Sequence, residues 1–127
     1  MPGIKIENLS FSYKKKKNST QDVLFNINAT FPSNKISVIV GPSGCGKTTL
    51  LKTILGLEKY SGDIYFDNVL VNNLSIQDRG LSYVNQNITL FEHLTAFENI
   101  AFPLKLIHAS SDEIRARIKE VAELLHI

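Results

Sequence analysis

The sequence "VIVGPSGCGKTTLLKTILG", residues 38–56, joins an apolar run to a glycine-rich turn and then to an amphipathic segment. Gly41, Gly46, Lys47 and Thr48 occupy every fixed position of the pattern G-x-x-x-x-G-K-[ST]. The pattern follows a strand-like run and opens a helix-like one, which is the context that distinguishes a phosphate-binding loop from a chance glycine-rich turn. The stretch therefore predicts a nucleotide-binding site.

The backbone shape of a phosphate-binding loop explains why glycine occupies positions 44 and 46. Amide N–H groups from Ser43 to Thr48 must turn inward around an anion, and Gly44 and Gly46 allow backbone angles and a close approach that a side chain would block. The helix that starts here directs its positive N-terminal end at the phosphates. We therefore expect residues 41–49 to line the phosphate site.

The loop side chains predict ATP and Mg²⁺ as cofactors. Lys47 is expected to reach the β- and γ-phosphates and to act in catalysis, and the Thr48 hydroxyl to ligate Mg²⁺. Thr49 is expected to donate a further hydrogen bond to phosphate. Cys45 is expected to contribute its backbone, because no histidine constellation beside it supports a catalytic thiol.

Composition restricts the other classes of function. The 127 residues carry 14 Lys and Arg against 12 Asp and Glu, a net charge of +2, which makes no case for nucleic-acid binding. The run "KKKK" at 14–17 is expected to be a solvated loop rather than a phosphate or lipid patch. One cysteine excludes an internal disulfide and fits a reducing compartment. No secretory leader precedes the first strand-like segment, and no apolar run reaches the roughly 20 residues of a membrane-spanning helix.

Hydrophobic spacing predicts strands, one helix, more strands and then a helical end. Strands are expected at 4–13, 23–31, 35–40 and 81–86, and a pair at 62–73 joined near Asp67 and Asn68. The strand at 35–40 should be buried. One face of the strand at 23–31 is expected to carry Val23, Phe25, Ile27, Ala29 and Phe31.

Helices are expected from Thr48 to a C-cap at Gly56, at 94–106 until Pro103 interrupts or kinks the helix, and from 110 onward. Ser110 and Glu113 form a capping box. The apolar stripe of the first helix is expected to be Leu50, Leu51, Ile54 and Leu55. The stripe of the last helix is expected to be Ile114, Ile118, Val121, Ala122 and Leu125.

At this point the sequence resembles the ATP-binding subunits of ABC transporters, importer-like, in their N-terminal part. Beyond the loop, the resemblance rests on Tyr13 in "LSFSY", on "GLSYVNQN" and on "TLFEHLTAFENIAFPLKL". It implies that Tyr13 stacks on adenine, although an ordinary strand aromatic is the alternative. It implies that Gln86, as the Q-loop glutamine, approaches Mg²⁺ and the attacking water.

The resemblance also implies partners. The region from Gln86 to Phe102 would receive a transmembrane permease subunit, while most of its apolar side chains would be core. A second ATP-binding subunit would complete a head-to-tail dimer of the full-length protein, at the cytoplasmic face of the membrane. The implied fold is an α/β P-loop NTPase of the ABC ATPase type. Its N-terminal antiparallel β region and nucleotide-binding core would occupy 1–88, and the start of a helical subdomain 89–127.

The family's signature "LSGGQ" and its Walker B Asp-Glu are absent from the sequence. We therefore expect an incomplete ATPase that binds Mg-ATP but hydrolyses little on its own, whereas the full-length form would drive transport. A non-transport ABC ATPase of the DNA-repair or translation type is one alternative. A non-catalytic nucleotide-binding or interaction module is another.

Overall fold

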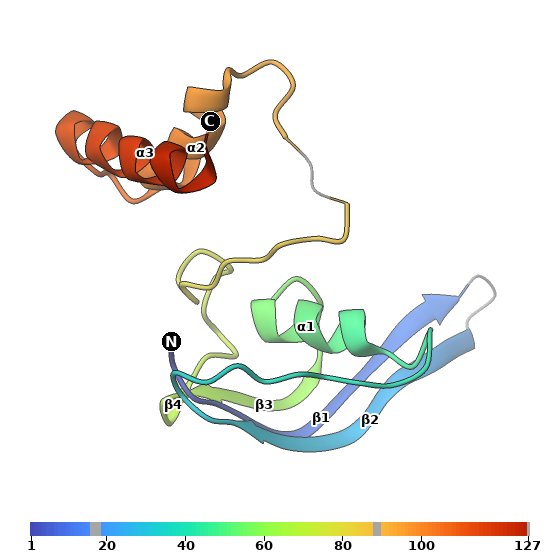
Figure 1. The fold of residues 1–127 in the computed structure, drawn as a ribbon. Coiled ribbons are helices and arrows are strands. Elements are labelled where there is room, and N and C mark those ends of the chain that lie inside the picture. Colours follow the sequence, from blue (N-terminus) through green and yellow to red (C-terminus); the bar gives the residue numbers. More distant parts are fainter. Residues whose placement is uncertain (16–18, 88–89, 127) are drawn as a thin grey trace. The chain divides into compact units, whose positions relative to one another are not determined.

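The computed structural model describes residues 1–15, 19–87 and 90–126, in two compact units, Met1–Tyr83 and Val84–Ile127 (Figure 1). The first unit contains four strands and one helix, and the second contains two helices. The first unit thus combines an antiparallel sheet with one helix, and the second unit is helical.

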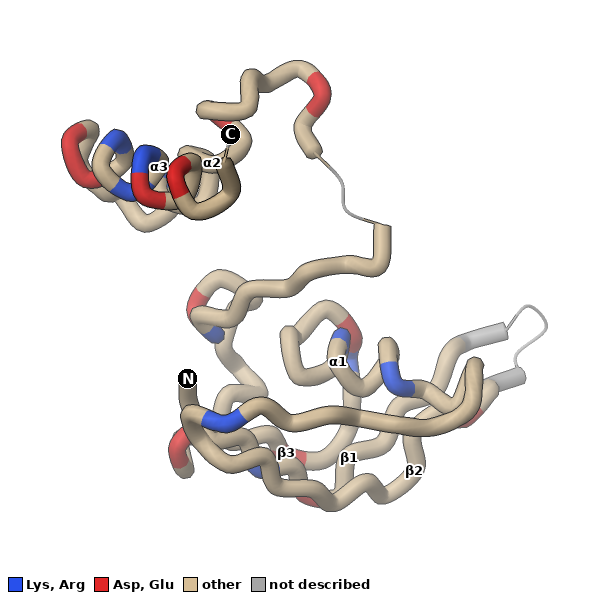
Figure 2. The backbone as a smooth tube through the Cα atoms, viewed as in Figure 1, with Lys and Arg blue, Asp and Glu red and all other residues tan. Residues whose placement is uncertain are grey.

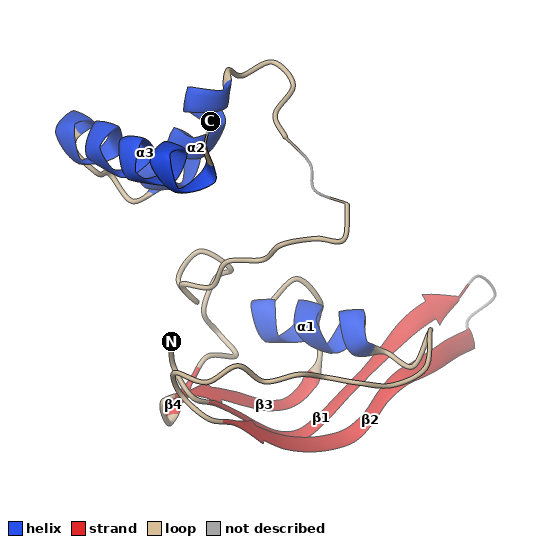
Figure 3. Ribbon diagram, viewed as in Figure 1, coloured by secondary structure: helices blue, strands red, loops and turns tan. Residues whose placement is uncertain are grey.

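The sheet of the first unit is antiparallel and has the strand order β2-β1-β3-β4. Its strands are β1 (Ile4–Lys15), β2 (Ser19–Phe31), β3 (Ser61–Phe66) and β4 (Val69–Leu70). Helix α1 (Lys47–Leu55) covers one face of this sheet (Figure 3). The segment from the end of β2 to α1 carries the glycine-rich turn.

The turn between β3 and β4 confirms the predicted pair of short strands. Asp67 and Asn68 have φ angles of 46° and 68°. Two successive positive φ values match a type I′ turn, whose twist suits a two-residue hairpin and which favours Asp and Asn.

The pairing of β1 with β2 contradicts one prediction. Phe25 is 78% exposed, whereas its neighbour Leu24 is buried. The register shifts between the pairs Leu9–Ile27 and Phe11–Leu24, and Asn26 has a φ of 48°. An extra residue in one strand turns the following side chains to the other face, so simple alternation fails past the bulge.

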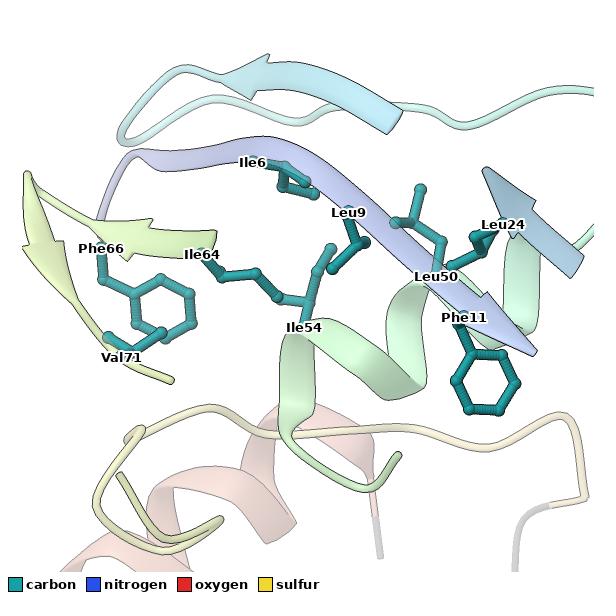
Figure 4. Close-up of a cluster of buried hydrophobic side chains, with 9 residues drawn as sticks. All are labelled: Ile6, Leu9, Phe11, Leu24, Leu50, Ile54, Ile64, Phe66 and Val71. Carbon is teal, nitrogen blue, oxygen red and sulfur yellow. The ribbon is translucent and has the colours of Figure 1, made fainter. Parts of the chain in front are cut away.

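The main core lies between the sheet and α1 (Figure 4). Leu50 and Ile54 of α1 meet side chains from β1, β2 and β3, while Leu51 of the same predicted stripe is 42% exposed. The buried members of this core are Ile6, Leu9, Phe11, Leu24, Leu50, Ile54, Ile64, Phe66 and Val71.

Two predicted strands are wrong. Residues 35–40 and 81–85 have no strand structure, and Gln86 lies in a bend. Ile36, Val38 and Val40 are exposed, as is Val84. A buried strand needs neighbours for its backbone N–H and C=O groups. Within the described residues, neither segment pairs with a strand.

The second unit is a helical pair, α2 (Ala96–Leu106) and α3 (Ser111–Leu125). Ala101 of α2 is fully buried against Ile114 and Ile118 of α3, which form a small core. Helix α2 continues through Pro103 to Leu106, so Pro103 does not interrupt it, and the alternative of a kink stays a prediction. The outer end of the predicted α3 stripe is open to solvent, since Leu125 is 58% exposed.

Both helices of this unit begin with a capping box. The predicted box of Ser110 and Glu113 is confirmed, and Thr95 with Glu98 forms a second one that the sequence reading missed. Figure 2 shows basic and acidic residues interspersed along α3. Such mixing is typical of a solvated helix face.

Of the basic run at 14–17, the first two residues extend β1 and the last two lie outside the described residues. Among the described helices, none combines the length and apolarity needed to cross a membrane.

Candidate functional site: the phosphate loop

The loop between residue 40 and α1 has the backbone that the glycine pattern predicts. Gly44 and Gly46 have φ angles of 79° and 96°, in the left-handed region that favours glycine. The N–H of Cys45 donates to the carbonyl of Pro42 at 3.4 Å, which closes a short turn. The chain then enters α1 directly, with Gly46 as its N-cap.

Contact with β2 fixes the end of the loop. A Cβ atom at Gly46 would lie 3.2 Å from side-chain carbons of Val23 and Leu24 and from the carbonyl oxygen of Val23. Leu24 belongs to the main core. The loop therefore approaches the sheet so closely that only glycine fits without displacing its neighbours.

Lys47 lies folded over the loop. Its Nζ donates to the carbonyl oxygens of Gly41 and Pro42, at 2.8 Å in each case, and lies 3.8 Å from the Sγ of Cys45. The ammonium group thus stands at the mouth of the turn, where it neutralises carbonyl dipoles. An incoming anion offers the same cation stronger partners than these carbonyls.

The N-terminus of α1 has, in its N-cap and first turn, no side chain that neutralises its partial positive charge. No acidic residue lies in its first turn, and its N-cap makes no side-chain hydrogen bond. The first amides of a helix lack intrahelical partners and carry partial positive charge. Thr48 is exposed at this end, whereas Thr49 is buried with 8% of its surface accessible.

The remaining loop side chains are exposed. Ser43 and Cys45 both face solvent, and Cys45 is a free thiol. A Cβ atom at Gly41 would lie 2.8 Å from the Sγ of Cys45, so this pair also packs closely. The structure therefore brings together all the loop residues from Gly41 to Thr49.

Tyr13 is connected to the loop through Phe11 and Leu24. Its ring meets Phe11 edge-on, with centroids 4.6 Å apart, and its hydroxyl donates to Glu58 at 3.5 Å. Phe11 pairs across the sheet with Leu24, against which Gly46 packs. The Tyr13 side chain is 41% exposed, which leaves part of its ring available to a ligand.

Gln86 belongs to the second unit, whereas the loop belongs to the first. It is exposed, and its backbone N–H donates to the Asn85 side chain at 2.8 Å. Further along, Asn99 ties the turn before α2 together, because its side chain bonds to backbone groups of Phe91, Leu94 and Thr95. The sequence gives no signal for this role of Asn99.

Among the residues that the structure describes, neither the apolar pocket of the first unit nor a metal-binding cluster provides an alternative to the loop as a nucleotide site. A pocket of about 250 Å³ in the first unit is lined mainly by apolar side chains, including Ile4, Ile39 and Leu81, and no loop residue lines it. Within the described ranges, no three His, Cys, Asp or Glu residues come together to hold a metal ion. A metal at the loop would therefore depend on Thr48, on phosphate oxygens and on water.

Comparison with known proteins agrees with this geometry. The profile of the ABC transporter family matches residues 24–127, so the chain belongs to that family. The chain is similar to the sn-glycerol-3-phosphate import ATP-binding protein UgpC of Yersinia enterocolitica, with 38% identity over 128 residues. That match covers 100% of this chain and 34% of the relative, so the chain spans about a third of the relative's length.

Two further similarities point the same way. The spermidine/putrescine import ATP-binding protein PotA of Thermotoga maritima is 45% identical over 106 residues, which cover 83% of this chain and 29% of that protein. The solved dimeric structure of MJ0796, a bacterial ABC transporter cassette, superposes with a TM-score of 0.82 at 30% identity. It covers 98% of this chain and 57% of the cassette chain. The family resemblance and the fold class are thereby confirmed.

Proposed function

We propose that this chain binds Mg-ATP at residues 41–49. The observation that carries the proposal is the loop itself. Gly44 and Gly46 have left-handed backbone, the N-terminus of α1 has no side-chain cap, and the Lys47 ammonium stands over the turn. This arrangement offers backbone donors, a helix dipole and a lysine ammonium to one anion. A second solved structure of MJ0796 in a post-hydrolysis state holds ADP and Pi, which supports a nucleotide as the ligand.

The residues have separate roles in this proposal. Backbone amides from Ser43, Gly44, Cys45 and Gly46 surround the phosphates, and Lys47 leaves its carbonyl partners to bind the β- and γ-phosphates. Thr48 ligates Mg²⁺ from its exposed position, and Tyr13 offers its free ring surface to adenine. Thr49 is buried, so its contribution would come from its backbone N–H.

The longer protein is proposed to hydrolyse ATP and to drive import across a membrane. The relatives named above are import ATP-binding proteins, which favours transport over the DNA-repair or translation type. In that protein, Gln86 would approach the metal and the attacking water, and the region from Gln86 to Phe102 would contact a permease at the cytoplasmic face of the membrane. A second subunit would face the loop, in line with the dimeric cassette.

Nucleotide affinity tests the proposal. In Lys47→Ala, Mg-ATP affinity measured by calorimetry should fall by a factor of about 100, because a charge-assisted contact with phosphate is worth about 1.5–3 kcal/mol and the loop loses its cation. Lys59→Ala removes the same charge from an exposed position outside the loop and should bind as the unaltered chain does.

Unchanged affinity in Lys47→Ala would refute the assignment. Turnover of the 127 residues is measured in the same samples. Binding with little hydrolysis is expected, whereas a rate like that of full-length family members would contradict the view that these residues hold only part of an active site.

A further inference from the structure

Arg79 is a buried cation of the first unit, and nothing in the sequence marks it as functional. Its side chain is 6% exposed. A turn positions it: the Ser75 hydroxyl bonds to Asp78 at 2.6 Å, and the Arg79 N–H donates to the Ser75 carbonyl at 3.2 Å. Within the described residues, no carboxylate forms an ion pair with the guanidinium.

Its partners are instead the last carbonyls of α1. Arg79 donates through one terminal nitrogen to the carbonyl oxygens of Thr53, at 3.2 Å, and Ile54, at 2.7 Å. Carbonyls at a helix C-terminus lack intrahelical partners and carry partial negative charge. A buried guanidinium therefore caps the end of α1 opposite to the phosphate loop.

The glycine that ends α1 makes room for this cap. Gly56 has a φ of 81°, and a Cβ atom there would lie 2.8 Å from the Nε of Arg79 and 2.9 Å from its Cζ. The Gly56 and Leu57 N–H groups donate to the Thr53 and Lys52 carbonyls. Backbone and guanidinium together satisfy the helix end, and any larger residue at 56 would displace the guanidinium.

The other side of the guanidinium is tied to the sheet. Its second terminal nitrogen donates to the Tyr60 hydroxyl at 3.1 Å, and the group lies 5.8 Å from the centre of that ring. The Tyr60 hydroxyl donates to the Asn72 side chain at 3.1 Å. Asn72 in turn accepts from the Ile64 N–H at 3.0 Å and donates to the Gly62 carbonyl at 2.9 Å, both in β3.

From these contacts we infer that Arg79 is a positioning residue for the phosphate loop, acting through α1. The inference rests on the proposed nucleotide function of that loop. Helix α1 has nine residues, fewer than the roughly 12–15 at which an isolated helix becomes even marginally stable. Its open N-terminus must hold the loop in shape before an anion arrives, so its rigidity depends on packing and on the cap at its other end.

Amide hydrogen exchange of the nucleotide-free 127-residue chain provides the first test. In Arg79→Met the α1 amides from Leu50 to Leu55 should exchange faster, because the Ile54 carbonyl loses the guanidinium, the Thr53 carbonyl keeps only the Gly56 N–H, and the short helix opens more often. The matched control is Phe66→Leu, which loosens the core at the far end of the sheet (Figure 4). Exchange of each variant is measured at the same number of degrees below the midpoint temperature of its own thermal unfolding.

Mg-ATP affinity provides the second test. Arg79→Met should weaken binding by about tenfold, since the apparent affinity falls with the fraction of chains whose loop is in the binding-competent shape. Phe66→Leu should not weaken it. Arg79→Lys, which keeps a charged donor for the carbonyls, should recover part of the affinity.

The outcomes separate the two proposals. If the unaltered chain does not bind Mg-ATP, the proposed function fails, and the exchange comparison alone decides the role of Arg79. If Arg79→Met behaves like Phe66→Leu in both measurements, the inference is overturned. Should Arg79→Met not fold, Tyr60→Phe, which removes one guanidinium partner, must speed exchange in α1, and unaltered exchange there would refute the inference.

Discussion

Gly44 and Gly46 adopt similar backbone angles in different surroundings. A Cβ atom at Gly44, where φ is 79°, would meet no heavy atom within 4 Å, whereas one at Gly46 would press on Val23 and Leu24. The two positions therefore separate backbone strain from steric exclusion within one loop.

Alanine at each position should show this separation. Gly44→Ala is expected to lower the free energy of unfolding by about 1–2 kcal/mol, the cost of left-handed backbone for a residue with a Cβ. Gly46→Ala should cost about 1–3 kcal/mol more, because β2 must shift as well. Urea unfolding measures both, and equal losses would show that β2 yields without cost.

Single residues also show the limits of pattern reading. The glycine-lysine pattern predicted the loop because each of its positions is needed for the backbone shape or the charge of the loop itself, and neither depends on distant residues. Phe25 was misplaced because a bulge at Asn26 interrupts the alternation, and a bulge depends on the partner strand. Arg79 was missed because its partners, Thr53, Ile54 and Tyr60, lie far away in sequence.

Among the elements, α2 and α3 begin where side chains within three residues of the helix start form a capping box. The Glu113 side chain accepts from the Ser110 N–H at 2.8 Å, and the Glu113 N–H donates to the Ser110 hydroxyl oxygen at 3.3 Å. Hydrogen bonds from the Ser110 side chain and backbone lower the pKa of Glu113. The same arrangement with Thr95 lowers the pKa of Glu98, and the hydrogen bond from the Thr95 backbone N–H is the largest cause.

These boxes make the helix starts sensitive to acid. A carboxyl whose pKa is lower in the folded state stabilises that state above the unfolded pKa, and the contribution is lost as the pH falls through the folded pKa. We expect carbon-13 NMR to show Glu113 titrating below the ordinary Glu value of 4.5, and Ser110→Ala to raise its pKa toward that value. Ser111→Ala removes the adjacent hydroxyl and serves as the control. An unchanged Glu113 pKa in Ser110→Ala would rule out the capping box in solution.

Residues 35–40 are a segment with strand-like sequence but without strand structure. Ile36, Val38 and Val40 are 96%, 77% and 85% exposed, while Ile39 packs against the main core. Sequence patterns record what a segment prefers, but a strand also needs a partner edge. For this reason the hairpin of β3 and β4, whose partners are neighbours in sequence, was predictable, whereas this segment was not.

Threonine substitutions distinguish an unpaired segment from a buried strand. Val38→Thr should change the free energy of unfolding by less than about 0.5 kcal/mol, as is usual at exposed positions. Ile39→Thr should lower it by about 1–3 kcal/mol, because a hydroxyl enters the core. Thermal unfolding measures the pair, and a large loss in Val38→Thr would indicate that 35–40 is buried in solution.

For the whole molecule, the chain combines a well-formed sheet-and-helix core with much uncovered apolar surface. The exposed apolar residues include Phe25, Val84, Leu90, Ile107 and Leu124, from both units. Exposed apolar surface on this scale usually marks an interaction site. The chain spans 57% of the MJ0796 cassette chain, and we propose that further protein covers part of this surface in the longer relatives. The division of the chain at residues 88 and 89 into a core and a helical subdomain stays a prediction.

Tyr13 also has a practical consequence for spectroscopy. The sequence contains no tryptophan, so the unaltered chain is dark when excited at the red edge of indole absorption. A Tyr13→Trp substitution would place a single emitter where a half-exposed ring already stands against Phe11. Quenching of that emitter by an adenine nucleotide, but not by inorganic triphosphate, would report directly on the base rather than on the phosphates.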